Sequence, residues 1–336
     1  MPQLSIPEHF QSASVGEIWR VPYQDRSSAA KAWAQKHQLR PVSQTHTNVK
    51  LLLIDVQNTF CLPDFELFVG GRSGRGAIED NVRLCEFIYR NLGKIDHIIA
   101  TLDTHHLHQI FHPIFWIDKD GAHPTPAVTT ISPEDVESGR WRVNPEFSDR
   151  SPTQLQAYSL HYVQQLSDGG KYPLLIWPYH AMLGGIGHAL VPAVEEAIFF
   201  HGVARHSQAS LSIKGDRTLT ENYSALAPEV VTDQFGAEIG TKNDSLIKLL
   251  LESDRLIIAG QAQSHCVAWT VNDLLTEIQA IDQQLVRKVY LLEDCTSPVV
   301  IPGVVDYTAQ ADAAYQRFAA AGMNIVKSTD DLMLLG

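Results

Sequence analysis

The chain has few of the features that would assign it to a class at once. Its 336 residues include four cysteines, scattered without a Cys-x-x-Cys pair. That spacing argues against a disulfide framework and against a zinc site built from cysteines. The first residues also lack a basic start followed by an apolar core, so no signal peptide is expected. We therefore expect a protein of a reducing compartment, the cytoplasm.

Clusters of basic residues and long apolar runs are missing as well. The formal net charge is −12, and no block is rich in lysine or arginine. An acidic chain gains little from a phosphate backbone, so nucleic acid is not an expected partner. No uninterrupted apolar run is long enough to span a membrane, so no membrane partner is expected either. The hydrophobic share of 44% and the charged share of 19% are those of an ordinary globular protein.

Short apolar runs alternate with stretches of helical spacing along most of the chain. Residues 78–92 and 267–275 have the apolar spacing of amphipathic helices. This alternation predicts βαβ units, and hence a three-layer α/β/α (Rossmann-like) fold with a mostly parallel sheet buried on both faces. The runs expected to form strands are residues 50–55, 96–103, 172–176, 197–202, 256–260 and 286–293, with a weaker run at 322–327.

The pattern predicts one elaborated domain. Residues 1–47 are polar and mixed, with a helix-like piece at 27–37, and are interpreted as an N-terminal extension. The domain itself is expected to span residues 48–336. Within it, segments 113–170 and 215–245 are rich in Pro, Ser, Asp and Gly, which is typical of insertions or lids.

Three chemically useful side chains, Asp55, Asp103 and Cys266, each come at or just after the end of an expected strand. Ligands bind beyond the carboxyl ends of parallel strands, so these residues are expected at one site. Cys266 also precedes a helix, whose positive end favours a thiolate, although most free cysteines are small buried hydrophobes. Asp55 is either a base for that thiol or a cap of the turn that follows it.

Histidines and a carboxylate are concentrated in the stretch TLDTHHLHQIFHP. Its Asp103-x-His105 pair, together with His180 of WPYH, offers ligands that suit zinc, iron or manganese. His106 and His108 are interpreted as solvated surface residues. Lys214, in IKGDRTLTENYSAL, would be a surface charge if taken alone, but next to a cysteine and an aspartate it would help to hold a thiolate.

Taken together, these pieces resemble the isochorismatase-like cysteine hydrolases, and within them most closely the nicotinamidases. The resemblance runs from about Val49 to the C-terminus and implies the isochorismatase-like hydrolase fold. Each motif is weak alone, but five in the same order form a specific signal. They are LLIDVQNTF, ATLDTHH, WPYH, IKGDRTLTENYSAL and GQAQSHCVAWTVNDLL.

The resemblance implies a role for each matching position. Asp55, Lys214 and Cys266 match the catalytic triad, and the amides of Ala262 and Cys266 match the oxyanion hole. A cis peptide bond is implied between Gln261 and Ala262. The implied ligands of a divalent ion, commonly zinc, are Asp103, His105 and His180. The implied walls around a flat aromatic ring are Phe60 and Trp177, with Tyr223 as an addition.

The chain also departs from the family pattern near these positions. Where the family places a second histidine after the Asp-x-His pair, this chain has Gln109, and either His112 or a water would take its place. Ser264 stands where an aspartate is usual, two residues before the nucleophile. These departures leave the three triad positions in place and weaken the assignment of one particular substrate.

The leading hypothesis is therefore a metal-containing cysteine amidohydrolase that acts on nicotinamide or a close aromatic amide. One alternative is a hydrolase of another small amide or carbamoyl compound on the same fold. A second is a catalytically silent, ligand-binding member. In each case the expected partner is a small molecule, and a homo-oligomer is expected from the resemblance.

Overall fold

The computed structural model describes residues 3–146 and 151–331. A six-stranded, entirely parallel sheet forms its centre, in the order β12-β9-β8-β1-β2-β7. Its strands are β1 (Val49–Ile54), β2 (His97–Asp103), β7 (Ser210–Lys214), β8 (Arg255–Gly260), β9 (Val289–Leu292) and β12 (Asn324–Val326). The predicted α/β class with a mostly parallel sheet is thus confirmed.

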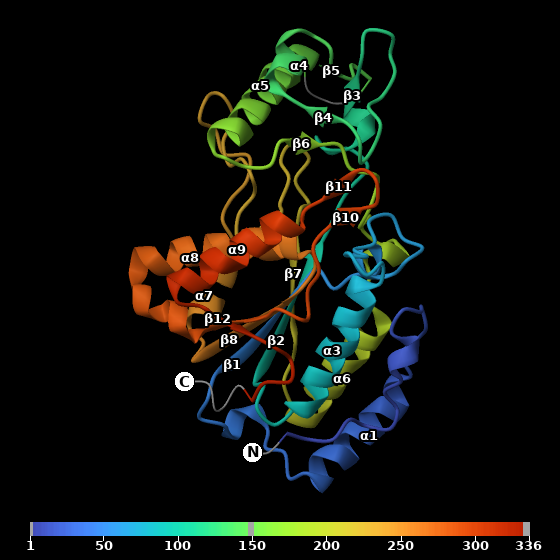
Figure 1. Cartoon of the computed structure of the whole chain (residues 1–336), viewed down its shortest axis with the longest axis vertical. Coiled ribbons are helices and arrows are strands. Elements are labelled where there is room, and N and C mark those ends of the chain that lie inside the picture. The colour runs from blue at the N-terminus through green and yellow to red at the C-terminus, as the bar shows by residue number, and fades with distance from the viewer. Residues whose placement is uncertain (1–2, 147–150, 332–336) are drawn as a thin grey trace.

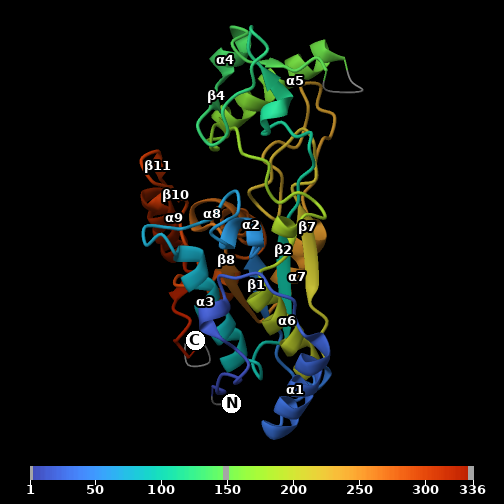
Figure 2. The same ribbon diagram turned by 90° about the vertical axis from the view of Figure 1, so that its right-hand side faces the viewer.

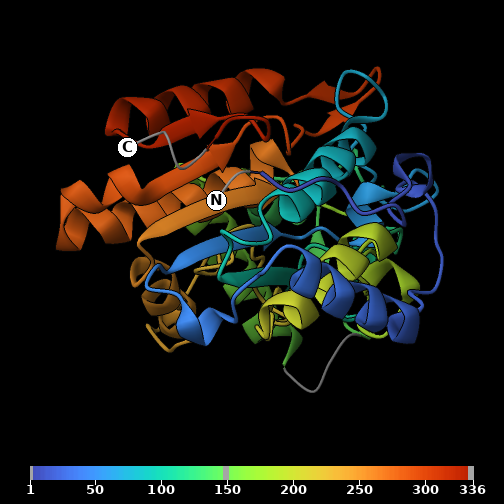
Figure 3. The same cartoon turned by 90° about the horizontal axis from the view of Figure 1, so that it is seen from below.

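Helices cover both faces of this sheet and give the predicted three layers, which are seen from below in Figure 3. One face packs on α3 (Gly76–Arg90) and α6 (Pro192–Arg205), and α1 (Tyr23–Lys36) lies outside them. The other face packs on α7 (Asp244–Leu251), α8 (Ala268–Ile281) and α9 (Thr308–Ala321).

The two cores on either side of the sheet follow from the alternation of side chains along each strand. In β1, Leu51 and Leu53 join the core beneath α3 and α6, whereas Leu52 and Ile54 join the core beneath α7, α8 and α9. All six residues of β1 are buried. A strand buried on both faces must be a continuous apolar run, and this is why β1 was recognisable from sequence.

A second lobe rises above the carboxyl ends of the strands (Figures 1 and 2). It has its own core, in which Trp116, Tyr162 and Ile176 are fully buried. Two residues of the cavity described below, Trp177 and Tyr223, also pack in or against this core. The elements of the lobe are β3 (Trp116–Ile117), β4 (Thr130–Ile131), α4 (Pro133–Glu137), β5 (Arg142–Val143), α5 (Pro152–Asp168) and β6 (Leu174–Leu175).

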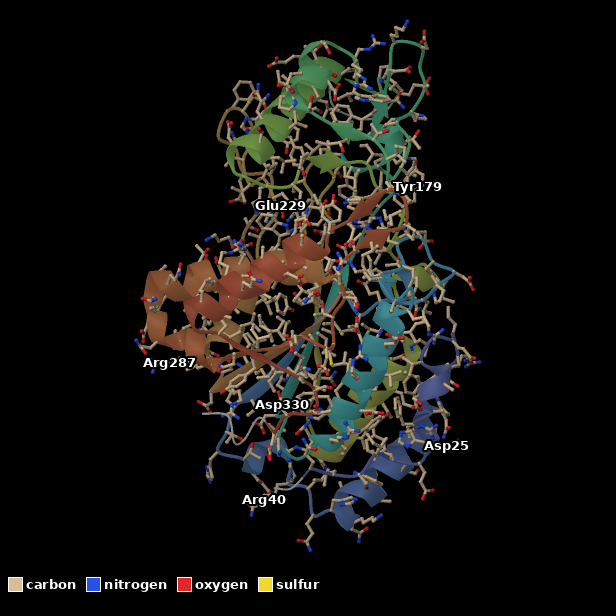
Figure 4. The ribbon with its side chains drawn as sticks, viewed as in Figure 1. Asp25, Arg40, Tyr179, Glu229, Arg287 and Asp330 are labelled. Carbon is tan, nitrogen blue, oxygen red and sulfur yellow. The ribbon has the colours of Figure 1, made fainter. Side chains whose placement is uncertain are left out.

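The level where the two lobes meet is marked by Tyr179 and Glu229 in Figure 4. Glu229 is buried, and its carboxylate lies 3.1 Å from Nζ of Lys171. The same ammonium lies 4.3 Å from the centre of the Trp269 ring in α8. Lys171 therefore contacts both a carboxylate and an aromatic ring near the junction of the lobes.

Residues 3–47 pack closely against the rest of the chain. Val15, Ala30 and Leu39 are members of the core beneath α3 and α6. In α1, Arg26 forms an ion pair with Glu196 of α6, and Tyr23 donates a hydrogen bond to Glu195.

One of the expected strands is wrong, and another lies outside the parallel sheet. Residues 197–202 lie inside α6, which begins with proline, a residue favoured in the first turn of a helix. Most of the α6 side chains in and around this run are buried, and a short apolar run of this kind does not distinguish a buried helix from a strand. Residues 172–176 do contain a strand, β6, but it pairs antiparallel with β4 in the upper lobe.

The edge strand β7 was not predicted. Its sequence, Ser-Leu-Ser-Ile-Lys, alternates polar and apolar residues, and Leu211 and Ile213 are exposed. An edge strand has no neighbour on one side, so it lacks the continuous apolar run of a central strand. The segment between β7 and α7 contains no helix or strand of its own.

Among the described residues, no helix has the length and apolar character needed to cross a membrane.

The turn after β8 is held from behind by α3. Gln261 donates a hydrogen bond from Nε2 to Oδ2 of Asp80, at 2.8 Å, and its Oε1 accepts one from the amide of Ser297. Asp80 also accepts a hydrogen bond from Arg83, at 2.8 Å. Burial raises the pKa of Asp80 to about 6, against the opposing effect of these donors.

The raised pKa of Asp80 predicts a pH-dependent contribution to stability. The protonated form is favoured in the folded state, so the contribution is present below the ordinary value of 3.8 and is lost as the pH rises through about 6. Relative to wild type, Asp80→Asn should therefore become more stable by about 1.4 kcal/mol between pH 5 and pH 7.5. Urea unfolding at both pH values gives the free energy of unfolding of each protein. The same change in this free energy between pH 5 and pH 7.5 for wild type and Asp80→Asn would contradict the prediction.

A second stability prediction concerns Asp96, whose carboxylate ties the N-terminal segment to α6. It accepts hydrogen bonds from Thr45, Thr47 and the amide of Val49, and it lies 3.1 Å from Arg205, which is itself buried. Asp96→Ala leaves that guanidinium buried without its carboxylate, so the free energy of unfolding should fall by about 3–5 kcal/mol. Asp312→Ala, at an exposed position of α9, should change it by less than about 0.5 kcal/mol. A similar small change for both variants in chemical denaturation would show that the Asp96 network is not stabilising.

Candidate functional site

The turn that carries Cys266 joins β8 to α8 at the carboxyl edge of the sheet. It includes a cis peptide bond between Gln261 and Ala262, at the position the resemblance implies, and a short π-helical turn, Gln263–Val267. Gly260, which ends β8, has φ +121°, and a Cβ atom there would lie 2.1 Å from the carbonyl oxygen of Ile54. Only glycine fits this close approach of β8 to β1.

Asp55 follows the neighbouring strand β1 and is fully buried. Its φ of +48° lies in the left-handed region, which aspartate tolerates better than most residues do. Oδ1 accepts a hydrogen bond from the Thr101 hydroxyl at 2.5 Å, and the same hydroxyl accepts one from the Asp55 amide at 3.0 Å. Thr101, in β2, thus fixes the direction of the carboxylate.

Lys214 connects the groups of the site. It ends the edge strand β7 and is buried, and its ammonium donates a hydrogen bond to the carbonyl of Asn222 at 2.7 Å. Nζ lies 2.8 Å from Oδ1 of Asp103, 3.0 Å from Oδ2 of Asp55 and 3.6 Å from Sγ of Cys266. The structure therefore brings together the three residues that were matched to the triad, although they are far apart in sequence.

The electrostatics of this group keep the thiol protonated at rest. Burial raises the pKa of Cys266 well above its ordinary value, and the carboxylates of Asp55 and Asp103 add to this effect while Lys214 opposes it. Burial also raises the pKa of Asp55, again against the opposing effect of Lys214. A carboxylate with a raised pKa is a stronger base, which suits it to accept the proton of a neighbouring thiol.

Asp103, His105 and His180 form a second, adjoining group. All three are buried, and their ligand atoms lie within 4.8 Å of one another. Nε2 of His105 lies 2.9 Å from Oδ2 of Asp103, and Nε2 of His180 lies 3.7 Å from the same oxygen. Burial opposes ionisation of Asp103, but His105 and Lys214 outweigh it and hold the pKa of Asp103 well below its ordinary value.

The hydrogen bonds of the two imidazoles show that this group fits a metal ion. Nδ1 of His105 is bonded to the carbonyl of Gly215 at 3.1 Å, and Nδ1 of His180 to the carbonyl of Pro178 at 2.8 Å. A carbonyl only accepts, so each Nδ1 carries the hydrogen and each Nε2 is turned to Asp103. Two imidazole nitrogens and a carboxylate oxygen, oriented by carbonyls behind them, are a donor set suited to a divalent cation such as zinc.

Gly215 has a steric role beside this group. Its φ is +81°, and a Cβ atom there would lie 2.7 Å from Oδ1 of Asp103 and 2.9 Å from Cε1 of His105. The loop after Lys214 therefore needs glycine at its first position to pass this close to both side chains.

Neither Gln109, which stands at the place of the family's second histidine, nor His112, which was expected as one possible replacement, belongs to the group of three. Gln109 donates hydrogen bonds from Nε2 to the carbonyls of Gly215 and Arg217, so its amide holds the loop after β7. The ring centre of His112 lies 5.9 Å from that of His105 and 6.2 Å from that of His180. Its Nδ1 is bonded to the carbonyl of Leu107. His112 thus borders the group of three, called the metal group below, without belonging to it.

A cavity of about 350 Å³ opens beside Cys266. The three residues predicted to contact an aromatic ring, Phe60, Trp177 and Tyr223, all line it, as do Ala262, Asp103 and His180. Nε1 of Trp177 donates to the Tyr223 hydroxyl at 3.1 Å, which fixes the indole relative to the phenol. The ring of Phe60 contacts that of His180 edge to face, with centres 5.7 Å apart. The cavity therefore connects the thiol, the metal group and the aromatic walls.

Two buried polar side chains of the cavity were missed by the sequence analysis. Glu221 lines the cavity, and burial raises its pKa to about 7. His265, adjacent to Cys266, also lines it, and burial lowers the pKa of His265 to about 3. Both fall inside motifs that were recognised, but a single glutamate or histidine within a motif does not show which way its side chain points.

Comparison with solved structures supports the fold. The structure of the yeast nicotinamidase Pnc1p bound to the inhibitor nicotinaldehyde is similar, with a TM-score of 0.50 and 20% identity, covering 83% of this chain and 99% of that one. A nicotinamidase/pyrazinamidase from Acinetobacter baumanii covers 85% and 99%, with a TM-score of 0.47 and 17% identity. A pyrazinamidase of Pyrococcus horikoshii in complex with zinc covers 83% and 99%, with a TM-score of 0.42 and 18% identity.

At the level of sequence, no protein-family model matches the chain, and a search of curated proteins finds no match. The structural likeness lies below 25% identity and therefore concerns the fold. The expected relation to nicotinamidases is confirmed at that level: the chain has the α/β fold of the yeast nicotinamidase.

Proposed function

We propose that the protein is a metal-containing cysteine amidohydrolase that converts nicotinamide, or a close aromatic amide, to the acid and ammonia. The observation that carries the proposal is the position of the Lys214 ammonium, within 3.6 Å of Cys266 Sγ and within 3.0 Å of the Asp55 and Asp103 carboxylates. The thiol lies on the wall of a cavity that is otherwise largely aromatic and apolar, and Lys214 joins it to the buried base Asp55 behind that wall. A thiol beside a base and a cation is suited to nucleophilic attack on an amide carbonyl.

In the first half of the proposed reaction, Asp55 accepts the thiol proton of Cys266, and the thiolate attacks the amide carbon. A C–S bond forms, and the carbonyl electron pair moves to the oxygen. The amides of Ala262 and Cys266 donate to that oxygen. Each such donor typically lowers the activation free energy by about 2.7–4 kcal/mol. The C–N bond then breaks, Asp55 returns the proton to the departing nitrogen, and ammonia leaves a thioester behind.

In the second half, a water molecule attacks the thioester carbon while Asp55 accepts one of its protons. The C–S bond breaks, the acid is released, and the proton passes from Asp55 back to the sulfur. Lys214 stays charged throughout, because the negative groups around it outweigh burial and raise its pKa well above the ordinary value. It offsets the negative charge that alternates between Cys266 and Asp55.

Asp103, His105 and His180 would hold a divalent ion at the edge of the same cavity. When bound, such an ion would supply a Lewis acid to which the ring nitrogen of a pyridine amide can bind. Phe60 and Trp177 would then enclose the ring. In this proposal Asp103, His105 and His180 would contribute to substrate choice through the ion that they would hold, whereas the bond-making groups belong to the chain itself.

Ammonia release from nicotinamide, measured with and without the Cys266 thiol, tests the proposal directly. Wild type loaded with metal should release ammonia from nicotinamide, and Cys266→Ala should lower kcat by at least about 1,000-fold, since the nucleophile is lost. Cys295→Ala is a matched control, because this buried thiol lies outside the cavity lining and contacts Asp294. Folding of each variant is checked by circular dichroism. Near wild-type activity in a folded Cys266→Ala protein would refute the nucleophile assignment.

If the metal-loaded wild type releases no ammonia from nicotinamide, the substrate assignment is refuted instead. Turnover of other small amides or carbamoyl compounds, lost in Cys266→Ala, would then identify the alternative hydrolase. Absence of any Cys266-dependent turnover would favour the ligand-binding alternative.

Metal content provides a second test that does not depend on activity. His180→Ala and His105→Ala each remove one of three protein ligands, so the metal retained after dialysis should fall well below one ion per chain. His106→Ala is the matched control, since that side chain is exposed beside His105 and only its backbone amide bonds to Gln109. Elemental analysis of the purified proteins gives the stoichiometry. Unchanged metal in both ligand variants would mean that the ion, if present, is held elsewhere.

A further inference from the structure

The cavity is larger than nicotinamide needs. Its volume is about 350 Å³, within the range of roughly 300–1,000 Å³ of pockets that enclose drug-sized ligands. Nicotinamide has nine non-hydrogen atoms, far fewer than a drug-sized ligand. Once a pyridine ring lies between Phe60 and Trp177, part of the cavity is therefore left for a further group on the ring.

The remaining walls of the cavity are mostly apolar and come from two segments that lie outside the motifs matched to the family. One is the loop after α2 (Asn58–Cys61), and the other is the hairpin of β10 (Val300–Ile301) and β11 (Val305–Asp306), which rises toward the upper lobe in Figure 1. The apolar residues that these segments place on the cavity are Phe65, Leu67, Phe68, Val69, Val299, Val300, Ile301 and Pro302.

The hairpin is attached to the turn that carries the nucleophile. The amide of Val299 donates to the Ser264 hydroxyl at 3.0 Å, and the amide of Tyr307 donates to the Val299 carbonyl at 3.0 Å. Outside the cavity, Arg72 forms an ion pair with Asp306 at 2.9 Å. These contacts hold Val299–Pro302 in place next to Cys266, so this wall is formed before a substrate binds.

The charged groups on the cavity limit the nature of that further group. Besides Asp103 of the metal group, the described residues that line the cavity include two glutamates, Glu66 and Glu221, and neither lysine nor arginine. Apart from the ion that the metal group would hold for the ring nitrogen, an anionic substituent would meet carboxylates with no cationic side chain on the lining to pair with. A neutral, apolar substituent would instead lose water-exposed surface against the hairpin, which is favourable.

We infer that the site also accepts aromatic carboxamides larger than nicotinamide, whose ring carries a neutral apolar substituent packed against the β10–β11 hairpin. This inference rests on the proposed amidohydrolase function and adds the substrate class. It assigns to Val300 and Ile301 a role in specificity, in contact with the substituent and away from the bond that is cleaved.

A graded set of amides tests the inference with the wild-type, metal-loaded protein. The probes are nicotinamide, 5-phenylnicotinamide and 6-phenylnicotinamide. The last two carry the same phenyl group at two different ring positions. We expect at least one phenyl compound to be hydrolysed with a kcat/KM no lower than about one tenth of that for nicotinamide, whereas a pocket fitted to nicotinamide alone would reject both. A carboxylate on the phenyl ring should lower kcat/KM by at least about tenfold, because Glu66 and Glu221 line the cavity in addition to Asp103.

Two tryptophan variants on the same hairpin show where the substituent lies. Val300→Trp fills the space in front of the hairpin and should lower the ratio of kcat/KM for the accepted phenyl compound to that for nicotinamide by at least about fivefold. Val304→Trp, at an exposed position of the hairpin outside the cavity lining, should change this ratio by less than about twofold. An equal effect of both variants on the ratio would overturn the inference.

The outcomes separate this inference from the function on which it rests. Turnover of nicotinamide with rejection of both phenyl compounds overturns the inference and leaves the amidohydrolase in place. Turnover of a phenyl compound, with or without nicotinamide, supports it. If no amide in the set is hydrolysed by the metal-loaded protein, the proposed function fails, and the inference fails with it.

Discussion

The site depends on one buried ammonium. Lys214 lies between the carboxylates of Asp55 and Asp103 and faces the sulfur of Cys266. Without it, two buried carboxylates would repel each other, and desolvation would drive both toward their protonated forms. Together with His105, Lys214 keeps Asp103 ionised, whereas at Asp55 burial outweighs Lys214 and leaves a raised pKa that suits a base. The two carboxylates contact the same cation and differ because only Asp103 also contacts His105.

The parallel sheet is what makes this contact possible. Asp55, Asp103, Lys214 and the turn to Cys266 come at the ends of β1, β2, β7 and β8, which lie side by side and run in one direction. Side chains from four distant parts of the chain thereby reach one point, as is general for the carboxyl edge of such sheets. The approach is close enough that Gly260 and Gly215 have no room for a side chain. Behind the turn, Asp80 and Gln261 hold the backbone from the side of α3.

The upper lobe and the hairpin turn this edge into an enclosed cavity. Trp177 and Tyr223 pack in or against the core of the lobe and present their rings to the site, so the folding of that lobe determines the position of two cavity walls. The hairpin closes another side and is bonded to Ser264, two residues before Cys266. The groups proposed for catalysis thus belong to the sheet, whereas the shape of the cavity is set mainly by segments added around it.

The sequence by itself determined the sheet class, the central strands and the residues able to do chemistry. Continuous apolar runs such as β1 are recognisable because a strand buried on both faces has no polar alternative, and carboxylates or a thiol at their ends are conspicuous. It did not determine α6, whose buried apolar run is typical of either a helix or a strand, nor β7, whose edge position removes the apolar signal. Only the tertiary structure decided that Gln109 holds a loop, that His112 borders the metal group, and that Glu221 and His265 line the cavity. These properties depend on the direction of single side chains, which is set by packing between segments far apart in the chain and leaves no periodic pattern in the sequence.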